Sequence, residues 1–90
     1  MQILVTPTFL KTVKKLHTKQ KRAVDKAVQF ISNDPTKGVS KVGDLEGIAI
    51  YKFRMNTQQW LLAYRIISKK SVKLLLVGPY ENFYRELKGK

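Results

Sequence analysis

Apolar residues in the first third of the chain recur every three or four residues, a spacing typical of helices that pack one face on a core. One apolar set runs from Leu10 to Leu16, and a second runs from Val24 to Ile31. The pattern lapses between His17 and Arg22, so we expect a turn there and a helical hairpin, with one long bent helix as the alternative. Before the hairpin, residues 2 to 6 predict a short strand, and Pro7 fits the first position of a helix capped by the residue before it.

The period changes to two after NDPTKG, residues 33 to 38, where Pro35 stops the second helix. On one side of the strand expected at residues 48 to 55 stand Ile48, Ile50, Lys52 and Arg54, and on the other side stand Ala49, Tyr51, Phe53 and Met55. After a hairpin turn at Asn56 to Gln58, residues 60 to 67 and residues 72 to 77 are almost continuously apolar. Continuous apolar runs predict strands that are covered on both faces.

Gly78 and Pro79 end the last strand, and residues 80 to 87 predict a short helix or an ordered tail. A strand and two helices are thus followed by three consecutive strands. This order predicts an α+β fold, in which an N-terminal strand and a helical hairpin pack on an antiparallel sheet of about four strands. At this length we expect residues 1 to 90 to form a single domain.

The strongest feature of the composition is its charge. The chain has 18 Lys and Arg against 6 Asp and Glu, a formal net charge of +12, while its hydrophobic fraction of 43% is typical of a folded chain. A compact domain with so much charge of one sign repels itself unless an anion is nearby. The composition therefore favours a polyanionic partner, which is a nucleic acid, an acidic protein or an anionic membrane surface.

The scarcity of other reactive groups excludes several kinds of chemistry. The chain has no Cys, one His and six scattered carboxylates, so neither a metal site nor a thiol nucleophile is expected, and no cofactor is implied. No apolar run approaches the roughly 20 residues that span a bilayer, so we expect no membrane insertion. The apolar start of the chain is too short for a signal peptide, and the absence of Cys fits a reducing compartment. We therefore expect a cytoplasmic protein.

Lys, Arg and Tyr remain abundant, and these residues are suited to cleaving RNA without a metal. RNA carries its own nucleophile, the 2′-OH, so an enzyme has only to orient that oxygen, move its proton and stabilise the charge on the phosphate. Lys52 and Arg54 are the clearest candidates, because they alternate on one face of a strand. The alternative is that they protect a sheet edge against aggregation.

Further cations lie on the helices and in the tail. Their uniform sign favours contact with phosphates, although basic residues on a helix are usually just a solvated face. The candidates for RNA binding are Lys11, Lys14, Lys15, Lys19, Lys21 and Arg22 on the helices, and Arg85 and Lys88 in the tail. Tyr51, Trp60 and Tyr64 are expected to serve packing within the sheet.

The order and spacing of these parts resemble the RelE/ParE toxin superfamily, the toxins of type II toxin–antitoxin pairs. The resemblance covers essentially the whole chain. Its parts are the basic helical hairpin ending at NDP, the GDLEGI loop, and the segments IYKFR, QQWLLAYRI and KLLLVGPYENFYRELK. It implies a toxin that binds the ribosomal A site and cuts mRNA there. It also implies an acidic antitoxin that wraps the toxin in a hetero-oligomer.

The resemblance also implies roles for individual residues. Lys52 and Arg54 match the basic strand residues of RelE-type nucleases. Tyr80 stands where many relatives carry a catalytic His or Arg after the last strand, and Tyr84 stands where an aromatic residue stacks on the substrate base.

One position departs from the family pattern, because Leu61 stands where relatives carry an Arg. Arg65, on the same face of that strand, is the candidate to replace it. Two further functions stay open at this point. ParE-type members share the fold and inhibit DNA gyrase without a catalytic pair, and an altered catalytic set is also compatible with a weakened member that only binds RNA.

Overall fold

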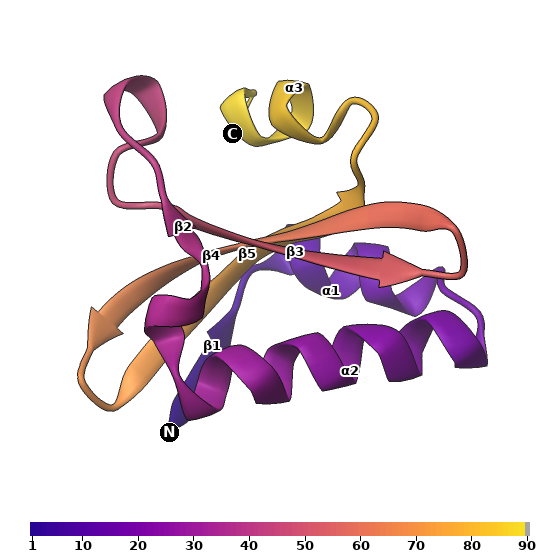
Figure 1. The fold of residues 1–90 in the computed structure, drawn as a ribbon, viewed down its shortest axis with the longest axis horizontal. Helices are drawn as coiled ribbons and strands as arrows, with labels where there is room; N and C mark the ends of the chain where they lie inside the picture. The colour runs from indigo at the N-terminus through magenta and orange to yellow at the C-terminus, as the bar shows by residue number, and fades with distance from the viewer. Residues whose placement is uncertain (90) are drawn as a thin grey trace.

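The computed structural model describes residues 1–89 as one five-stranded sheet with helices on both faces (Figure 1). The strands are β1 (Gln2–Val5), β2 (Val39–Ser40), β3 (Ala49–Met55), β4 (Gln58–Ser68) and β5 (Ser71–Pro79). The α-helices are α1 (Pro7–Lys14), α2 (Thr18–Asn33) and α3 (Phe83–Lys88), and the 3-10 turns are η1 (Pro35–Lys37) and η2 (Gly43–Leu45).

The sheet has the order β1-β5-β4-β3-β2. Its neighbours pair antiparallel except for β1, which lies parallel to β5 at one edge. The α+β class is therefore confirmed, while the expected number of about four strands, all antiparallel, is corrected to five with one parallel pair. The additional strand, β2, is only two residues long and has no apolar pattern that a sequence analysis detects.

The predicted helical hairpin is confirmed, with its turn displaced toward the N-terminus. Thr6 caps α1, since its hydroxyl oxygen accepts the backbone N–H of Phe9 at 3.1 Å. The break falls before Thr18, and the side chain of Gln20 accepts the backbone N–H of His17 at 3.1 Å. The apolar lapse after His17 marks the exposed first turn of α2 rather than the end of a helix.

Two apolar clusters lie on opposite faces of the sheet. The helix-side cluster joins Phe9, Val24 and Ile31 to buried strand residues such as Leu62 and Tyr64. Figure 1 shows α1 and α2 together on one side, with α3 and the loop around η2 on the other. The α3-side cluster has the buried members Ile48, Ile50, Leu61, Ala63, Leu76, Phe83 and Leu87. The prediction that β4 and β5 are covered on both faces is thus confirmed over their central residues.

The open edge of β3 is the part of the fold that positions a site. β2 pairs only with Ala49 and Ile50, so within the described chain the rest of β3 has β4 as its single neighbour. The expected alternation also holds, because Lys52 and Arg54 are exposed while Tyr51 and Phe53 pack against the helix-side cluster. None of the helices formed by residues 1–89 is long and apolar enough to cross a membrane.

Candidate functional site

The register of the strands places side chains from β3, β4 and β5 in rows on the α3 side of the sheet. Arg54 pairs with Gln59, and the backbone N–H of Tyr80 donates to the Gln59 carbonyl at 2.9 Å. In the next row, Lys52 pairs with Leu61, which pairs with Gly78. Directly opposed residues of antiparallel strands share a face, so Lys52 and Arg54 point to the same side as Gln59.

Lys52 and Arg54 share a small hollow. Its volume is about 210 Å³, and its lining consists of these two cations with Gln59 and Phe53. Arg54 is held in place there, since its Nη1 donates to the backbone carbonyl of Thr57 at 3.3 Å. No carboxylate belongs to this lining, so the local charge is positive and suits a phosphate group.

Tyr80 is joined to the row of Arg54 by its backbone bond to Gln59, but neither Tyr80 nor Tyr84 lines the hollow of Lys52 and Arg54. Tyr80 is 52% exposed, and its ring meets that of Tyr84 edge to face, with centroids 6.3 Å apart. Tyr84 is half-buried against the α3-side cluster, and its ring also meets Phe83 at 5.7 Å. The segment for which a short helix or an ordered tail was expected, residues 80 to 87, contains a helix that begins only at Phe83, after Asn82 adopts a positive φ of 65°, so Tyr80 lies before α3 and Tyr84 within it. The two rings come together across that turn.

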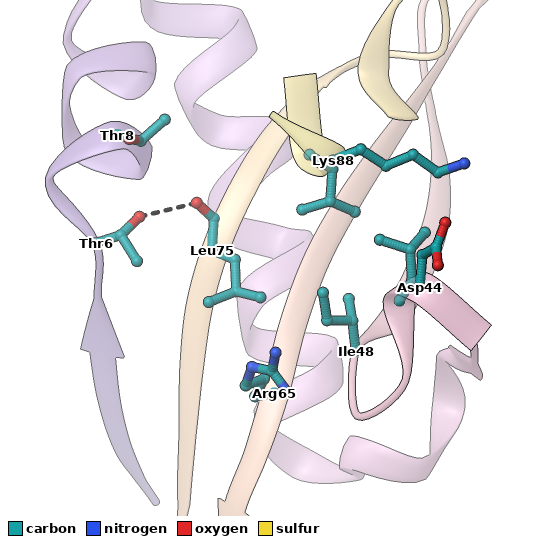
Figure 2. A pocket seen from close by; sticks show the side chains of 9 residues that line it. Thr6, Thr8, Asp44, Ile48, Arg65, Leu75 and Lys88 are labelled. Carbon is teal, nitrogen blue, oxygen red and sulfur yellow. Dashed lines mark hydrogen bonds between the residues drawn. The ribbon is translucent and has the colours of Figure 1, made fainter. Parts of the chain in front are cut away.

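Arg65 lies in a different hollow, shown in Figure 2. This hollow has a volume of about 500 Å³ and an apolar floor that includes Ile48 and Leu75. Its rim carries Asp44 and Lys88 as well as Arg65, so its charges are mixed. The Arg65 guanidinium packs closely on Gly47, two residues after η2. A side chain at Gly47 would collide with it, since an added Cβ would lie 2.5 Å from the Arg65 Nη1.

The proposal that Arg65 replaces the arginine of related proteins is therefore not supported by its position. Arg65 is four residues beyond Leu61 along β4, which separates their Cα atoms by roughly 13 Å. Leu61 itself has no exposed surface and belongs to the α3-side cluster. The structure thus brings Lys52 and Arg54 together, brings Tyr80 to Tyr84, and leaves Arg65 apart.

The remaining predicted cations are exposed and lie on the three α-helices and in the turn between α1 and α2. Those on α1, α2 and the turn between them cover the side of the sheet opposite α3, and they are Lys11, Lys14, Lys15, Lys19, Lys21 and Arg22. Arg85 and Lys88 are on α3, and Lys88 lines the hollow of Arg65 rather than that of Lys52.

Two residues of the site were not found from the sequence. Gln59 lies opposite Arg54, a pairing that follows from a two-residue turn at Asn56 and Thr57. Lys41 places its Nζ 5.5 Å from the centre of the Tyr84 ring, a cation–π contact. Nothing in the local pattern signals this approach of Lys41, because it depends on how the loop after β2 folds back.

The chemistry open to this site is electrostatic. Its fixed cations can stabilise charge that develops on a phosphate, and its exposed Tyr80 ring can stack on a base. Among residues 1–89, no group of three or more His, Cys, Asp or Glu side chains is placed to hold a metal ion.

The chain matches a known protein family in sequence and known structures in fold. Residues 3–88 match the family model for ParE-like toxins of type II bacterial toxin–antitoxin systems. The fold resembles E. coli toxin RelE in the intact RelBE toxin–antitoxin complex, with a TM-score of 0.69 and 21% identity over 89% of this chain and 96% of that chain. A mutant of E. coli RelE in the free state gives a TM-score of 0.74 and 19% identity over 97% of this chain and 90% of that one. No curated protein sequence matches the chain significantly.

Proposed function

Because this chain belongs to the ParE-like toxins of type II bacterial toxin–antitoxin systems, within the RelE/ParE superfamily, we propose that it is a metal-independent endoribonuclease that cuts mRNA in the ribosomal A site. The observation that carries the proposal is the hollow shared by Lys52 and Arg54. Both side chains are exposed at an open sheet edge, and the hollow they line contains no carboxylate.

The proposed reaction uses the nucleophile that RNA provides. The 2′-hydroxyl gives up its proton to water as its oxygen attacks the adjacent phosphorus, a new P–O2′ bond forms, and the P–O5′ bond breaks as the 5′-oxygen takes up a proton from water. Lys52 and Arg54 stabilise the negative charge that builds up on the phosphate oxygens. Arg54 is suited to this role because the Thr57 carbonyl already orients its guanidinium. Tyr80 and Tyr84 position the base next to the phosphate that is cut.

The proposed partners follow from charge and family. The formal net charge of +12 favours both the ribosome with its mRNA and an acidic antitoxin. In the E. coli RelBE complex the toxin is bound to its antitoxin, and we propose a comparable toxin–antitoxin hetero-oligomer in the cytoplasm for this chain. The exposed cations on α1 and α2 are proposed to contact RNA phosphates during binding to the ribosome.

The experiment that tests the proposal uses purified components. Translating ribosomes are stalled with a defined codon in the A site, the protein is added in the presence of EDTA at a concentration that leaves the ribosomes intact, and the mRNA is mapped by primer extension. A cut within the A-site codon is the expected result. Intact mRNA at protein concentrations equal to that of the ribosomes would overturn the nuclease proposal.

The rival functions are separated in parallel assays. A gyrase inhibitor reduces the supercoiling of a relaxed plasmid by DNA gyrase and leaves the A-site codon intact. A member of the family that only binds RNA leaves both the codon and the supercoiling unchanged, yet sediments with ribosomes in a manner that depends steeply on salt.

A further inference from the structure

A third hollow, a groove, lies on the other side of β3 from the hollow of Lys52, between this strand and α2. Its volume is about 510 Å³, and it opens beside the edge of β3 that β2 leaves unpaired. On α2 it exists because Ala23 and Ala27, one helical turn apart, have side chains too small to fill the space in front of the strand. The candidate RNase site, on the opposite face, does not account for this groove.

Three aromatic rings form a continuous stack along the groove. Phe30 of α2 stacks on Tyr51 with centroids 5.2 Å apart, and Tyr51 stacks on Phe53 at 6.1 Å with only 12° between the ring planes. Phe30 is 44% exposed and lies outside both apolar clusters; besides Tyr51, its ring is met by Lys37, whose Nζ is 5.9 Å from the ring centre. A row of this kind offers aromatic surface to further planar rings.

Cations line the groove and no carboxylate does. Lys19, Arg22 and Lys26 stand on successive turns of one face of α2, and Arg54 contributes from β3. Residues three or four apart on a helix are about 5–6 Å apart, so the helix presents a regular series of positive charges. The matching ligand is a chain that carries negative charge at every repeat and a planar ring beside it.

We propose that this groove binds single-stranded RNA, with bases against the stack of Phe30, Tyr51 and Phe53 and phosphates on the cations of α2. Stacking platforms with positive charge alongside them are the usual means by which proteins hold single-stranded nucleic acid. A polyglutamate chain would satisfy the charges but would bring no planar ring to the aromatic row, whereas each nucleotide brings both a phosphate and a base.

The groove and the hollow of Lys52 share two lining residues, Phe53 and Arg54, at the open edge of β3. An RNA strand can therefore pass from the groove over the open edge of β3 to the cations that we propose act on its phosphate. This connection rests on the proposed function, whereas the binding of RNA in the groove does not.

The test measures binding without cleavage. The probe is a 12-nucleotide oligouridylate with 2′-O-methyl groups, which lacks the nucleophile and stays uncut, and its affinity is measured by fluorescence anisotropy. Phe30→Ala is expected to weaken binding about 5-fold to 100-fold, the usual range for the loss of one stacked base. The control Ile67→Ala removes an equally exposed apolar side chain, 51% against 44%, from the far end of β4 and is expected to change the affinity less than twofold.

A second pair of variants tests the phosphate contacts. Lys26→Glu is expected to weaken binding more than tenfold and to reduce the slope of log K against log salt concentration by about one. The control Lys69→Glu makes the same change in net charge in the turn between β4 and β5, and is expected to have a much smaller effect on both quantities.

Three results would overturn the inference. The first is unchanged binding by Phe30→Ala, and the second is equal effects of Lys26→Glu and Lys69→Glu. The third is binding of a polyglutamate peptide of the same length that is as tight as the binding of RNA and is weakened by Phe30→Ala to the same degree. The groove would then be a site for an acidic protein. Since the probe cannot be cut, these outcomes are independent of whether the A-site mRNA is cleaved.

Discussion

The two faces of β3 carry different chemistry on a single strand. On the α3 side, Lys52 and Arg54 are exposed, and neither belongs to an apolar cluster. On the side of α1 and α2, Tyr51 and Phe53 are half-buried and pack against the helix-side cluster. Because the side chains of a strand alternate, one segment of seven residues serves both the stability of the fold and the candidate site.

This difference predicts that substitutions on the two faces should have different effects on activity and on stability. A change on the charged face should alter the reaction and spare the fold, since those side chains support no core. A change on the aromatic face should reach the packing of α2 on the sheet as well as any ligand in the groove.

The largest effect is expected from the charged face. Lys52→Ala and Arg54→Ala should each lower the rate of A-site cleavage on the order of 100-fold to 1000-fold, the usual loss when one fixed charge no longer stabilises the transition state. The melting temperature should change little, because both side chains are exposed. Single-turnover cleavage and thermal unfolding of the same preparations measure the two quantities.

The matched control is Lys69→Ala, which removes one exposed Lys from the turn between β4 and β5 and should leave the cleavage rate within twofold of the original. Full activity in either the Lys52 or the Arg54 variant would contradict the assignment of the site. A large fall in melting temperature would contradict the separation of the two faces.

Leu61 is the position where the separation is expected to fail. It lies opposite Lys52 on the charged face, yet it is fully buried beneath α3 with Phe83 and Leu87. Leu61→Arg places an unpaired charge in this apolar cluster and should lower the free energy of unfolding by about 3 kcal/mol or more. Urea denaturation measures the change, and protease cleavage near α3 reports whether that helix has been displaced.

The conservative control Leu61→Met keeps the volume apolar and should cost less than about 1.5 kcal/mol. An Arg at this position that is tolerated without loss of stability would show that α3 does not hold Leu61 in a closed cluster. The absence of an arginine there would then have no structural reason.

Much of the fold was predictable because it depends on local periodicity. The hairpin of α1 and α2, the alternation of β3 and the two covered strands all follow from apolar spacing. The order of the strands was not predictable, since the pairing of β1 with β5 joins segments about 70 residues apart and no local pattern specifies it. For the same reason the sequence placed Arg65 on the correct face of β4 but could not show that a separate hollow surrounds it.

The candidate site was predictable where it lies on one strand and not where it lies between loops. Lys52 and Arg54 were identified from their alternation on β3. Lys41 was not identified, because its approach to Tyr84 requires the loop after β2 to fold back toward α3. Side chains that meet through loops depend on contacts that short-range spacing does not encode.

A smaller effect, on stability alone, is expected from Tyr64 on the helix side of the sheet. Its buried hydroxyl donates to the Pro35 carbonyl and accepts the Gly38 N–H at 3.0 Å, which ties the segment before β2 to the sheet. Tyr64→Phe leaves these two backbone groups without their partner and should lower the free energy of unfolding by about 1–3 kcal/mol. The rate of cleavage should stay the same.

The pH dependence of this effect has a defined sign. Burial raises the pKa of Tyr64 above its ordinary value near 10, so the folded state holds the phenolic proton more tightly than the unfolded state does. The stability that depends on this proton is complete below about pH 10 and is lost as the pH rises through the folded pKa. Urea unfolding at pH 8 and pH 10.5 measures how much the free energy of unfolding of the unchanged protein exceeds that of Tyr64→Phe. This difference should be smaller at pH 10.5, and an equal difference at both pH values would contradict this explanation.

The smallest effect is expected from Arg65→Ala, which tests how far the candidate site extends along the α3 side of the sheet. Arg65 is exposed and lines the hollow with Asp44 and Lys88, roughly 13 Å along β4 from the row of Lys52. A charge at that distance, next to a carboxylate and open to solvent, is screened from a phosphate held by Lys52 and Arg54. Single-turnover cleavage of the A-site codon should therefore stay within about twofold of the unchanged protein. A loss of tenfold or more would mean that substrate reaches both hollows at once, and the functional boundary would then be the whole α3 side of the sheet instead of the open edge of β3.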